Sequence, residues 1–336
     1  MRDGFFARRS APCRVQRFRC RHCRRRFSQQ TFRCTYWLKR PRLLPAVLRG
    51  LVSCDCLRQM ARALAASPQT ILLQANRLGR HCQLFHEQHR PLGPLTEPLA
   101  FDGFQSFEYS QYHPTWYHAV AGRRSHFFYG FTDSELRRSG SMSAGQKRTR
   151  AVLEQRHGRP DPGSIEQETA AVLAVVCAVP QTIELHSDQH PAYPRALRRL
   201  VHLHVQHHTI SSRATRSTSH PLFAINLLDL LIRHSGANHK RETIAFAKRR
   251  QMAIWRLWVM LVWRNYLKWV SERRRQDTPA MRLGIFRRRL GVAQLLRRRL
   301  FVTRVGLPPR WQAYYWGQVV TRLMPRGREH RLRYAS

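Results

Sequence analysis

The stretch LAFDGFQSFEYS (99–110) decides the fold, because apolar and polar side chains alternate along it as they do in a half-buried β-strand. Two stretches of the same kind follow, TWYHAVAG (115–122) and SHFFYGFTD (125–133). Three strands so close together in the chain predict one continuous sheet. An acidic residue, Asp102, stands inside the first of them, where an uncompensated charge is costly.

The pattern beyond this sheet changes between strand and helix. TIELHSD (182–188) and HLHVQHHTI (202–210) are typical of two more strands, and AAVLAVVCA (170–178) of a short buried helix. The polar, basic residues 134–168 predict an insertion or connector. From Leu222 onward the pattern is helical, with one long helix expected over 243–273. The sequence therefore predicts an α/β protein.

The charge balance points to a polyanionic partner. The 336 residues include 60 Lys and Arg against 19 Asp and Glu, a formal net charge of +41. Phosphates neutralised by Arg and Lys release condensed counterions, so nucleic acid is the expected partner. The alternative is that GC-rich codon usage inflates the Arg content. The most apolar stretch, 252–267, is too short for a membrane span and carries two Arg. We therefore expect no membrane association, and a cytoplasmic protein associated with the bacterial nucleoid.

Residues 43–88 have the pattern of a helix-turn-helix. One apolar helical face precedes Ser67 and Pro68, which are favoured at a helix start. The second helix would enter the major groove of DNA and read base edges with its first residues. The alternative is a helical hairpin that never touches DNA. The expected base-reading residues are Gln69, Thr70, Gln74 and Arg77.

Two cysteines near the N-terminus, Cys20 and Cys23, have the C-x-x-C spacing of a zinc knuckle. A complete tetrahedral Zn²⁺ site needs two more ligands, and Cys13 and Cys34 are candidates although their spacing is unusual. The alternative is a basic arm, without zinc, that contacts phosphate.

Asp102 and Asp188 are the carboxylates of interest, because each belongs to a strand in a chain with few acidic residues. Two carboxylates brought together repel each other, and divalent cations such as Mg²⁺ relieve that repulsion. A pair of such cations can activate an attacking oxygen and stabilise a leaving oxygen on phosphorus. The alternative is that Asp102 caps a turn before Gly103 and that Asp188 starts a helix over 191–200.

The histidines form a second concentration of ligand-type side chains. They lie near Asp188 in sequence, and the H-x-H-x-x-H-H run of 202–208 has metal-ligating side chains without a spacing that fixes a geometry. Surface-exposed histidines on strands are the preferred interpretation, with His190 as a candidate for phosphate binding or proton transfer. The clustered residues are His186, His190, His204, His207 and His208.

The order of these features resembles the DDE transposases of insertion sequences. DGFQSF (102–107), SDQHPAYPRAL (187–197) and NHKRETIAFAKRR (238–250) carry the resemblance, and RVQRFRCRHCRRRFSQQTF (14–32) resembles the second knuckle of their zinc ribbon. The resemblance implies an RNase H-like mixed-sheet core, preceded by a partial zinc-ribbon and helix-turn-helix module. It also implies that the chain starts after the first knuckle, as an N-terminally truncated product would.

By this resemblance, Asp102 and Asp188 match the first two members of an acidic triad that binds Mg²⁺ or Mn²⁺. Asp229, in NLLD (226–229), is the favoured third member; Glu242 and Asn226 are its rivals. The basic residues around the last two positions are expected to contact DNA phosphates: Lys240, Arg241 and Lys248.

The resemblance also implies the organisation and the activity. We expect a zinc-ribbon or basic arm (1–42), a helix-turn-helix (43–88), a catalytic core (99–273) and a basic C-terminal tail (274–336). The expected function is a transposase that oligomerises with itself on double-stranded element ends and cleaves and joins them to target DNA. The alternatives are a truncated, inactive remnant or repressor that only binds DNA, and a basic RNA-binding protein.

Overall fold

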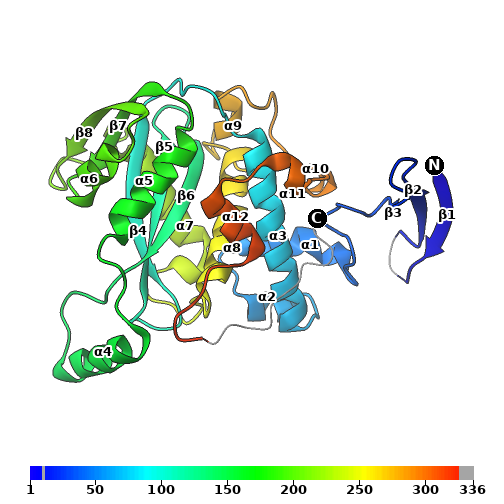
Figure 1. Ribbon diagram of the computed structural model, residues 1–336, viewed down its shortest axis with the longest axis horizontal. Coiled ribbons are helices and arrows are strands. Elements are labelled where there is room, and N and C mark those ends of the chain that lie inside the picture. Colours follow the sequence, from blue (N-terminus) through cyan, green and yellow to red (C-terminus); the bar gives the residue numbers. More distant parts are fainter. Residues whose placement is uncertain (10–11, 325–336) are drawn as a thin grey trace.

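A five-stranded mixed sheet is the centre of the protein, seen in a computed structural model that describes residues 1–9 and 12–324 (Figure 1). Its strand order is β6-β5-β4-β7-β8. The three strands expected at 99–133 and the two expected at 182–210 are therefore confirmed. The strands are β4 (Leu99–Phe107), β5 (Pro114–Gly122), β6 (Phe128–Glu135), β7 (Gln181–Asp188) and β8 (Leu203–Ile210).

Four of the five strands, all except β5, run in the same direction and have their carboxyl ends on the same side of the sheet. The first three strands pair antiparallel, whereas β7 runs parallel to β4 and β8 runs parallel to β7. This is a mixed α/β architecture compatible with the expected RNase H-like core. Parallel pairing is what brings the end of β7 beside the first half of β4.

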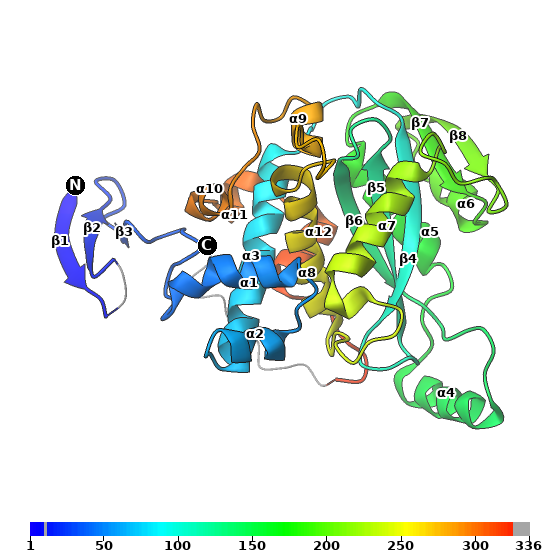
Figure 2. The ribbon, with the colours of Figure 1, turned by 180° about the vertical axis from the view of Figure 1, so that it is seen from behind.

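Helices cover both faces of the sheet (Figures 1 and 2). On one face, α5 (Ser164–Val176) contacts β5 and β6, and the ring of Tyr193 in α6 (Ala192–Arg198) lies 4.8 Å from that of Phe101. On the other face, α7 (Phe223–Ser235) packs against β4 and β5. α5 includes most of the helix expected at 170–178.

A layer of helices flanks the sheet on the side of β6 (Figure 1). α3 and α8 pack along each other, and Gly79 permits the contact because a Cβ there would overlap the backbone of Trp255. The helix expected over 243–273 is shorter: it begins at Arg250 and passes into a π-helical turn that ends at Leu267. The elements are η1 (Pro41–Leu43), α1 (Leu44–Leu51), α2 (Leu57–Ala63), α3 (Pro68–His89), η2 (Ala237–His239), α8 (Arg250–Val262) and η3 (Trp263–Leu267).

The residues expected as a basic tail, 274–336, are folded as far as the structure describes them, which corrects that expectation. Trp311 and Tyr314 are fully buried, and the Trp311 indole donates to the carbonyl of Phe131 at 2.9 Å. Aromatic burial thus outweighs the charge of the neighbouring Arg residues. Positions 325–336 lie outside the described residues. The elements are α9 (Pro279–Arg282), α10 (Val292–Arg297), α11 (Val302–Val305) and α12 (Pro309–Trp316).

Two parts stand away from the central sheet. The N-terminal strands form a separate antiparallel sheet at the far end of the molecule, and the connector 134–168 carries a projecting helix (Figures 1 and 2). Over 1–9 and 12–324, no helix has the length and apolar character needed to cross a membrane. The elements are β1 (Arg2–Ala7), β2 (Arg14–Arg19), β3 (Arg26–Ser28) and α4 (Ala144–His157).

Candidate active site

Asp102 and Asp188 lie side by side on neighbouring strands. The parallel register pairs Ala100 with His186 and Phe101 with Ser187, so the next step along both strands brings the two aspartates opposite each other. Adjacent strands are about 4.8 Å apart, and side chains of paired residues point to the same face. The idea that Asp102 caps a turn is wrong, because β4 continues without interruption to Phe107.

Asp188 also has the role that the sequence left open as an alternative, at the start of the helix that follows β7. Its Oδ1 accepts a hydrogen bond from the backbone N–H of His190 at 3.1 Å, which orders the turn into α6. One carboxylate oxygen is thus engaged with the backbone. The other is available to a ligand at the strand end.

The Asp102 carboxyl lies in an environment that disfavours its charge. Burial and then the charge of the neighbouring Asp188 raise its pKa to about 7, against the opposing effects of the backbone N–H of Gly103 and the charge of Arg216. The hydrogen bond from that N–H to Asp102 Oδ1 is 2.7 Å long. The chain alone therefore gives this carboxylate too little positive charge to keep it fully ionised at neutral pH.

Asp229 brings a third carboxylate to the same face from α7. Burial raises its pKa well above the usual value, and the Asp102 carboxylate adds to the shift, while Arg233 opposes it. Oδ1 of Asp229 is buried and has no hydrogen-bond partner. A buried oxygen without a partner beside another acid fits a position that receives a cation.

The rivals for this third position lie differently. Asn226 is on α7 one turn before Asp229 and is half-buried, so it faces the same side of the helix. Glu242 lies in the exposed segment between η2 and α8. Electrostatic contact with Asp102 therefore favours Asp229, and the identity of the third ligand stays a prediction.

Gly103 and Trp116 shape the opposite face of β4. A Cβ on Gly103 would overlap the indole of Trp116, so only glycine leaves room for that ring at the residue next to Asp102. The Trp116 ring lies 6.3 Å from the imidazole of His190. Tyr193 completes this wall, and burial followed by the charges of Asp102 and Asp188 raises its pKa.

Replacing Gly103 by Ala should destabilise the protein, because the added methyl group displaces the Trp116 ring. Overpacking of this kind costs about 1–3 kcal/mol, which urea unfolding monitored by tryptophan fluorescence would measure. Gly93→Ala is the matched control, since a Cβ at Gly93 meets nothing within 4 Å. Equal stability of the two variants would show that the Trp116 ring moves aside freely.

Oxygen-rich chemistry of this kind suits Mg²⁺ or Mn²⁺. Three carboxylates lie on one face, and one of them has a buried oxygen that lacks a partner. Within the described residues their oxygens do not all lie within 4.8 Å of one another, so the group is more open than a closed three-ligand site. Hard divalent cations prefer carboxylate oxygens and would supply the positive charge that this cluster lacks. Asp102, Asp188 and Asp229 stay the predicted ligands of such a cation.

The expected base-reading residues are only partly accessible. Gln69 is exposed, and Thr70 is engaged at the helix start, where Ser67 accepts a hydrogen bond from its backbone N–H at 3.1 Å. The prediction that Gln74 reads DNA bases is wrong, because Gln74 is buried and its amide donates to the carbonyl of Arg40 at 2.9 Å. Arg77 is half-buried, and burial lowers the pKa of its guanidinium.

The second helix of the expected helix-turn-helix is therefore not a free recognition helix. α3 runs for 22 residues, and most of its length packs against α8. Buried residues of α1–α3 belong to the same hydrophobic core as the strands of the central sheet. The boundary expected at residue 88 stays a prediction, and DNA contact remains open only for the exposed first turn of α3.

The cysteines do not assemble as a four-ligand site. Cys20 and Cys23 share one turn after β2, where backbone hydrogen bonds from Cys23 and His22 lower the pKa of Cys20. Cys34 is instead buried among the helices, and burial raises its pKa to about 12. Within the described residues, no three of the sulfurs of Cys13, Cys20, Cys23 and Cys34 lie within 4.8 Å of one another. The prediction that Cys34 is a zinc ligand together with Cys20 and Cys23 is therefore wrong.

The basic residues expected at the site lie on the surface of the protein. Lys240, Arg241 and Lys248 are exposed on the segment between η2 and α8. Arg233 reaches inward from α7 and donates to the carbonyls of Gln105 and His239. Phosphate binding by the three exposed side chains stays a prediction.

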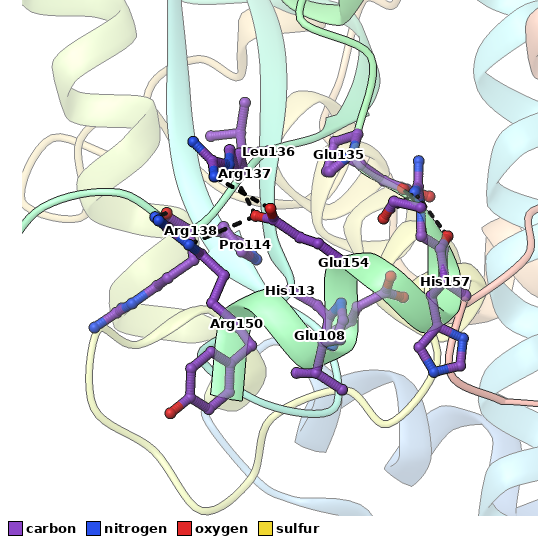
Figure 3. A pocket seen from close by; sticks show the side chains of 15 residues that line it. Glu108, His113, Pro114, Glu135, Leu136, Arg137, Arg138, Arg150, Glu154 and His157 are labelled. Carbon is purple, nitrogen blue, oxygen red and sulfur yellow. Dashed lines mark hydrogen bonds and ion pairs between the residues drawn. The ribbon is translucent and has the colours of Figure 1, made fainter. Parts of the chain in front are cut away.

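A pocket between α4 and the ends of β5 and β6 is a less suitable site (Figure 3). Its charged side chains neutralise one another: Glu154 accepts from Arg137 at 2.8 and 3.1 Å and lies 3.5 Å from Arg150. Few of its charges are left for a ligand.

Sequence reasoning missed Glu184 as a functional candidate. It lies two residues before His186 and four before Asp188, so all three side chains point to one face of β7. Two-residue spacing of ligand-type side chains along a strand is the signal that would have found it.

Comparisons with known proteins leave the family unassigned. No protein-family model and no curated protein matches this chain. Among solved structures, a chain of the simian T-cell lymphotropic virus intasome in complex with the PP2A regulatory subunit B56 gamma is similar, at 14% identity over 70% of each chain. Its TM-score is 0.24, so this likeness carries no argument about function.

Proposed function

We propose that this protein is a DDE-type transposase that binds the ends of an insertion element and carries out divalent-cation-dependent cleavage and strand transfer. The observation that supports this most directly is the pairing of Asp102 and Asp188 on adjacent parallel strands. Asp229 adds a third carboxylate, with one buried oxygen, from the helix over that face. The composition agrees, since a net charge of +41 suits a protein that holds DNA.

The three carboxylates would hold Mg²⁺ or Mn²⁺, and the bound cations would supply Lewis acidity at the scissile phosphate. The chain's own residues place these groups. β4 and β7 fix two carboxylates on a rigid sheet, and the N–H of His190 orients one oxygen of Asp188. Rigid positioning accounts for much of the rate in such reactions.

DNA would lie across the exposed basic surface beside the carboxylates. Lys240, Arg241 and Lys248 are proposed to neutralise phosphates, while Gln69 in the exposed first turn of α3 is proposed to contact the element ends. Assembly of several copies on paired element ends belongs to the same proposal. Each phosphate contact would make binding weaker at higher salt.

The test is cleavage of duplex DNA that carries the inverted repeats flanking the reading frame, in Mg²⁺ or Mn²⁺. Asp188→Ala and Asp229→Ala should each lower the rate at least about 100-fold, since a displaced reacting group costs that much. Glu242→Ala, on the exposed segment, is the matched control and should cleave like the wild type. A wild-type rate in Asp188→Ala would refute the active site.

The same assay distinguishes the proposed enzyme from a DNA-binding remnant. Both would shift the duplex in a gel-mobility experiment, and only the enzyme would produce a cation-dependent nick. Binding without any nick, in both Mg²⁺ and Mn²⁺, would favour a repressor-like protein. RNA binding without preference for the repeats would exclude both.

A further inference from the structure

Glu184, His186 and His208 form a second group of ligand-type side chains on the sheet. Glu184 and His186 project from the same face of β7, and His208 lies opposite His186 in the parallel register of β8. One ligand atom from each residue lies within 4.8 Å of the other two. The rings of the two histidines stack with centroids 4.8 Å apart.

The hydrogen bonding of His186 is not satisfied by the protein alone. Its Nε2 lies 2.6 Å from Oε1 of Glu184 and 2.8 Å from Nη1 of Arg123. A ring nitrogen that donates to the carboxylate cannot also accept from the guanidinium. Nδ1 of the same ring is buried without a partner. The fold thus fixes the position of the imidazole, but the neighbouring groups do not satisfy the hydrogen bonding of both ring nitrogens.

A metal ion bound by Nε2 would remove this conflict. The nitrogen lone pair and the Glu184 carboxylate would both face the ion, and Arg123 lies close enough to pair with Glu184, at 3.6 Å from Oε1. Arg123 is itself anchored, because its Nε donates to the carbonyl of Pro221 at 3.1 Å. A carboxylate that binds the metal and is also held by a second group is common around metal sites.

We propose that Glu184, His186 and His208 bind one Zn²⁺ ion, separately from the carboxylate cluster of Asp102. Two imidazoles and one carboxylate are a ligand set for zinc, whereas Mg²⁺ favours oxygen ligands alone. His208 is exposed, so the fourth position is open to water. The ion would tie the edge strand β8 to β7 two residues before Asp188. This proposal does not depend on whether the chain cuts DNA.

The binding experiment separates this site from the other two candidate metal sites, the Cys20 and Cys23 knuckle and the Asp102 carboxylate cluster. Zn²⁺ is titrated by calorimetry into the full chain carrying Cys20→Ser and Cys23→Ser, in excess Mg²⁺ to occupy carboxylate oxygens. One Zn²⁺ per chain is expected. His208→Ala should weaken binding at least about tenfold, because even residues that only orient a ligand cost that much. His204→Ala, exposed on the same strand, is the matched control and should bind as before.

Cobalt substitution gives a second readout. Co²⁺ in the same background should give visible d–d absorption without the sulfur charge-transfer bands of a thiolate site, and Glu184→Gln should diminish it. Both substituted side chains are at least partly exposed, so circular dichroism should report an unchanged fold. Absence of zinc binding, equal binding in the two His variants, or loss of zinc in Asp102→Asn would each overturn the proposal.

Discussion

Replacing Asp102 by Asn should abolish DNA cleavage and, without divalent cations, make the folded protein more stable at pH 8. Burial and the adjacent Asp188 raise the pKa of Asp102 to about 7 in the folded chain, above its unfolded value of 3.8. The stability linked to this proton is complete below about pH 4 and is lost as the pH rises through 7. At pH 8 the ionised side chain therefore weakens the fold, and the neutral amide of Asn does not.

The expected gain in unfolding free energy follows from the same pKa shift. A change of about three pKa units corresponds to about 4 kcal/mol, and partial solvent screening reduces this to about 1–3 kcal/mol. Urea unfolding in EDTA at pH 5 and pH 8 would measure it, with the difference between variant and wild type growing at the higher pH. Asp55→Asn, at an exposed position, is the control.

Added Mg²⁺ should reverse the order of stability. The wild type gains binding free energy from the cation, whereas Asp102→Asn lacks one ligand and gains less. A variant that is inactive yet less stable than the wild type in EDTA would mean that Asp102 supports the fold rather than a cation. A variant with full cleavage activity would remove Asp102 from the site altogether.

The sheet could be predicted because its strands carry a local signal. Alternation over 99–133 and at 182–210 gave the five strands, and the acidic positions Asp102 and Asp188 stood out within them. That these two would face each other depends on β7 pairing with β4 rather than with another strand. Only the resemblance to a known topology suggested that pairing, because no local pattern encodes which strands become neighbours.

Tertiary contacts account for the failures. Gln74 and Arg77 have the polarity of a DNA-facing helix, yet the length of α3 and its packing on α8 bury them partly or fully. The C-terminal residues have the composition of a solvated tail, but Trp311 and Tyr314 anchor them in the core. The high charge of this segment led to the prediction of a tail. In the folded protein, burial of its few aromatic residues holds the segment against the core.

The start of α8 depends on an ionic network that no sequence pattern revealed. Nε of Arg250 lies 3.0 Å from Asp133 Oδ2, and its Nη1 donates to Glu135 Oε1 at 2.6 Å. Its backbone N–H donates to Oε2 of Glu108 at 2.8 Å. Burial disfavours the charged guanidinium, but the three acids outweigh this and raise the pKa of Arg250.

Arg250→Met should therefore cost about 3–5 kcal/mol of unfolding free energy, the range for removing one partner of a buried ion pair. Asp133 is fully buried and would lose one of its two guanidinium partners. Urea denaturation at pH 7 would measure the loss. Arg249→Met, one residue earlier at the edge of the same helix, is the matched control and should change stability by less than about 1 kcal/mol.

A second substitution tests whether the Asp133 carboxylate, left without Arg250, causes the loss of stability in Arg250→Met. Asp133 also pairs with Arg310 at 3.3 Å and accepts from the hydroxyl of Tyr314 at 2.5 Å, so it joins α12 to the sheet as well as α8. Asp133→Asn in the Arg250→Met background should recover part of the lost stability, because the amide carries no charge to leave unpaired. If the double variant is less stable by the full sum of the two single losses, the contribution of Arg250 is packing of its side chain rather than neutralisation of buried acid.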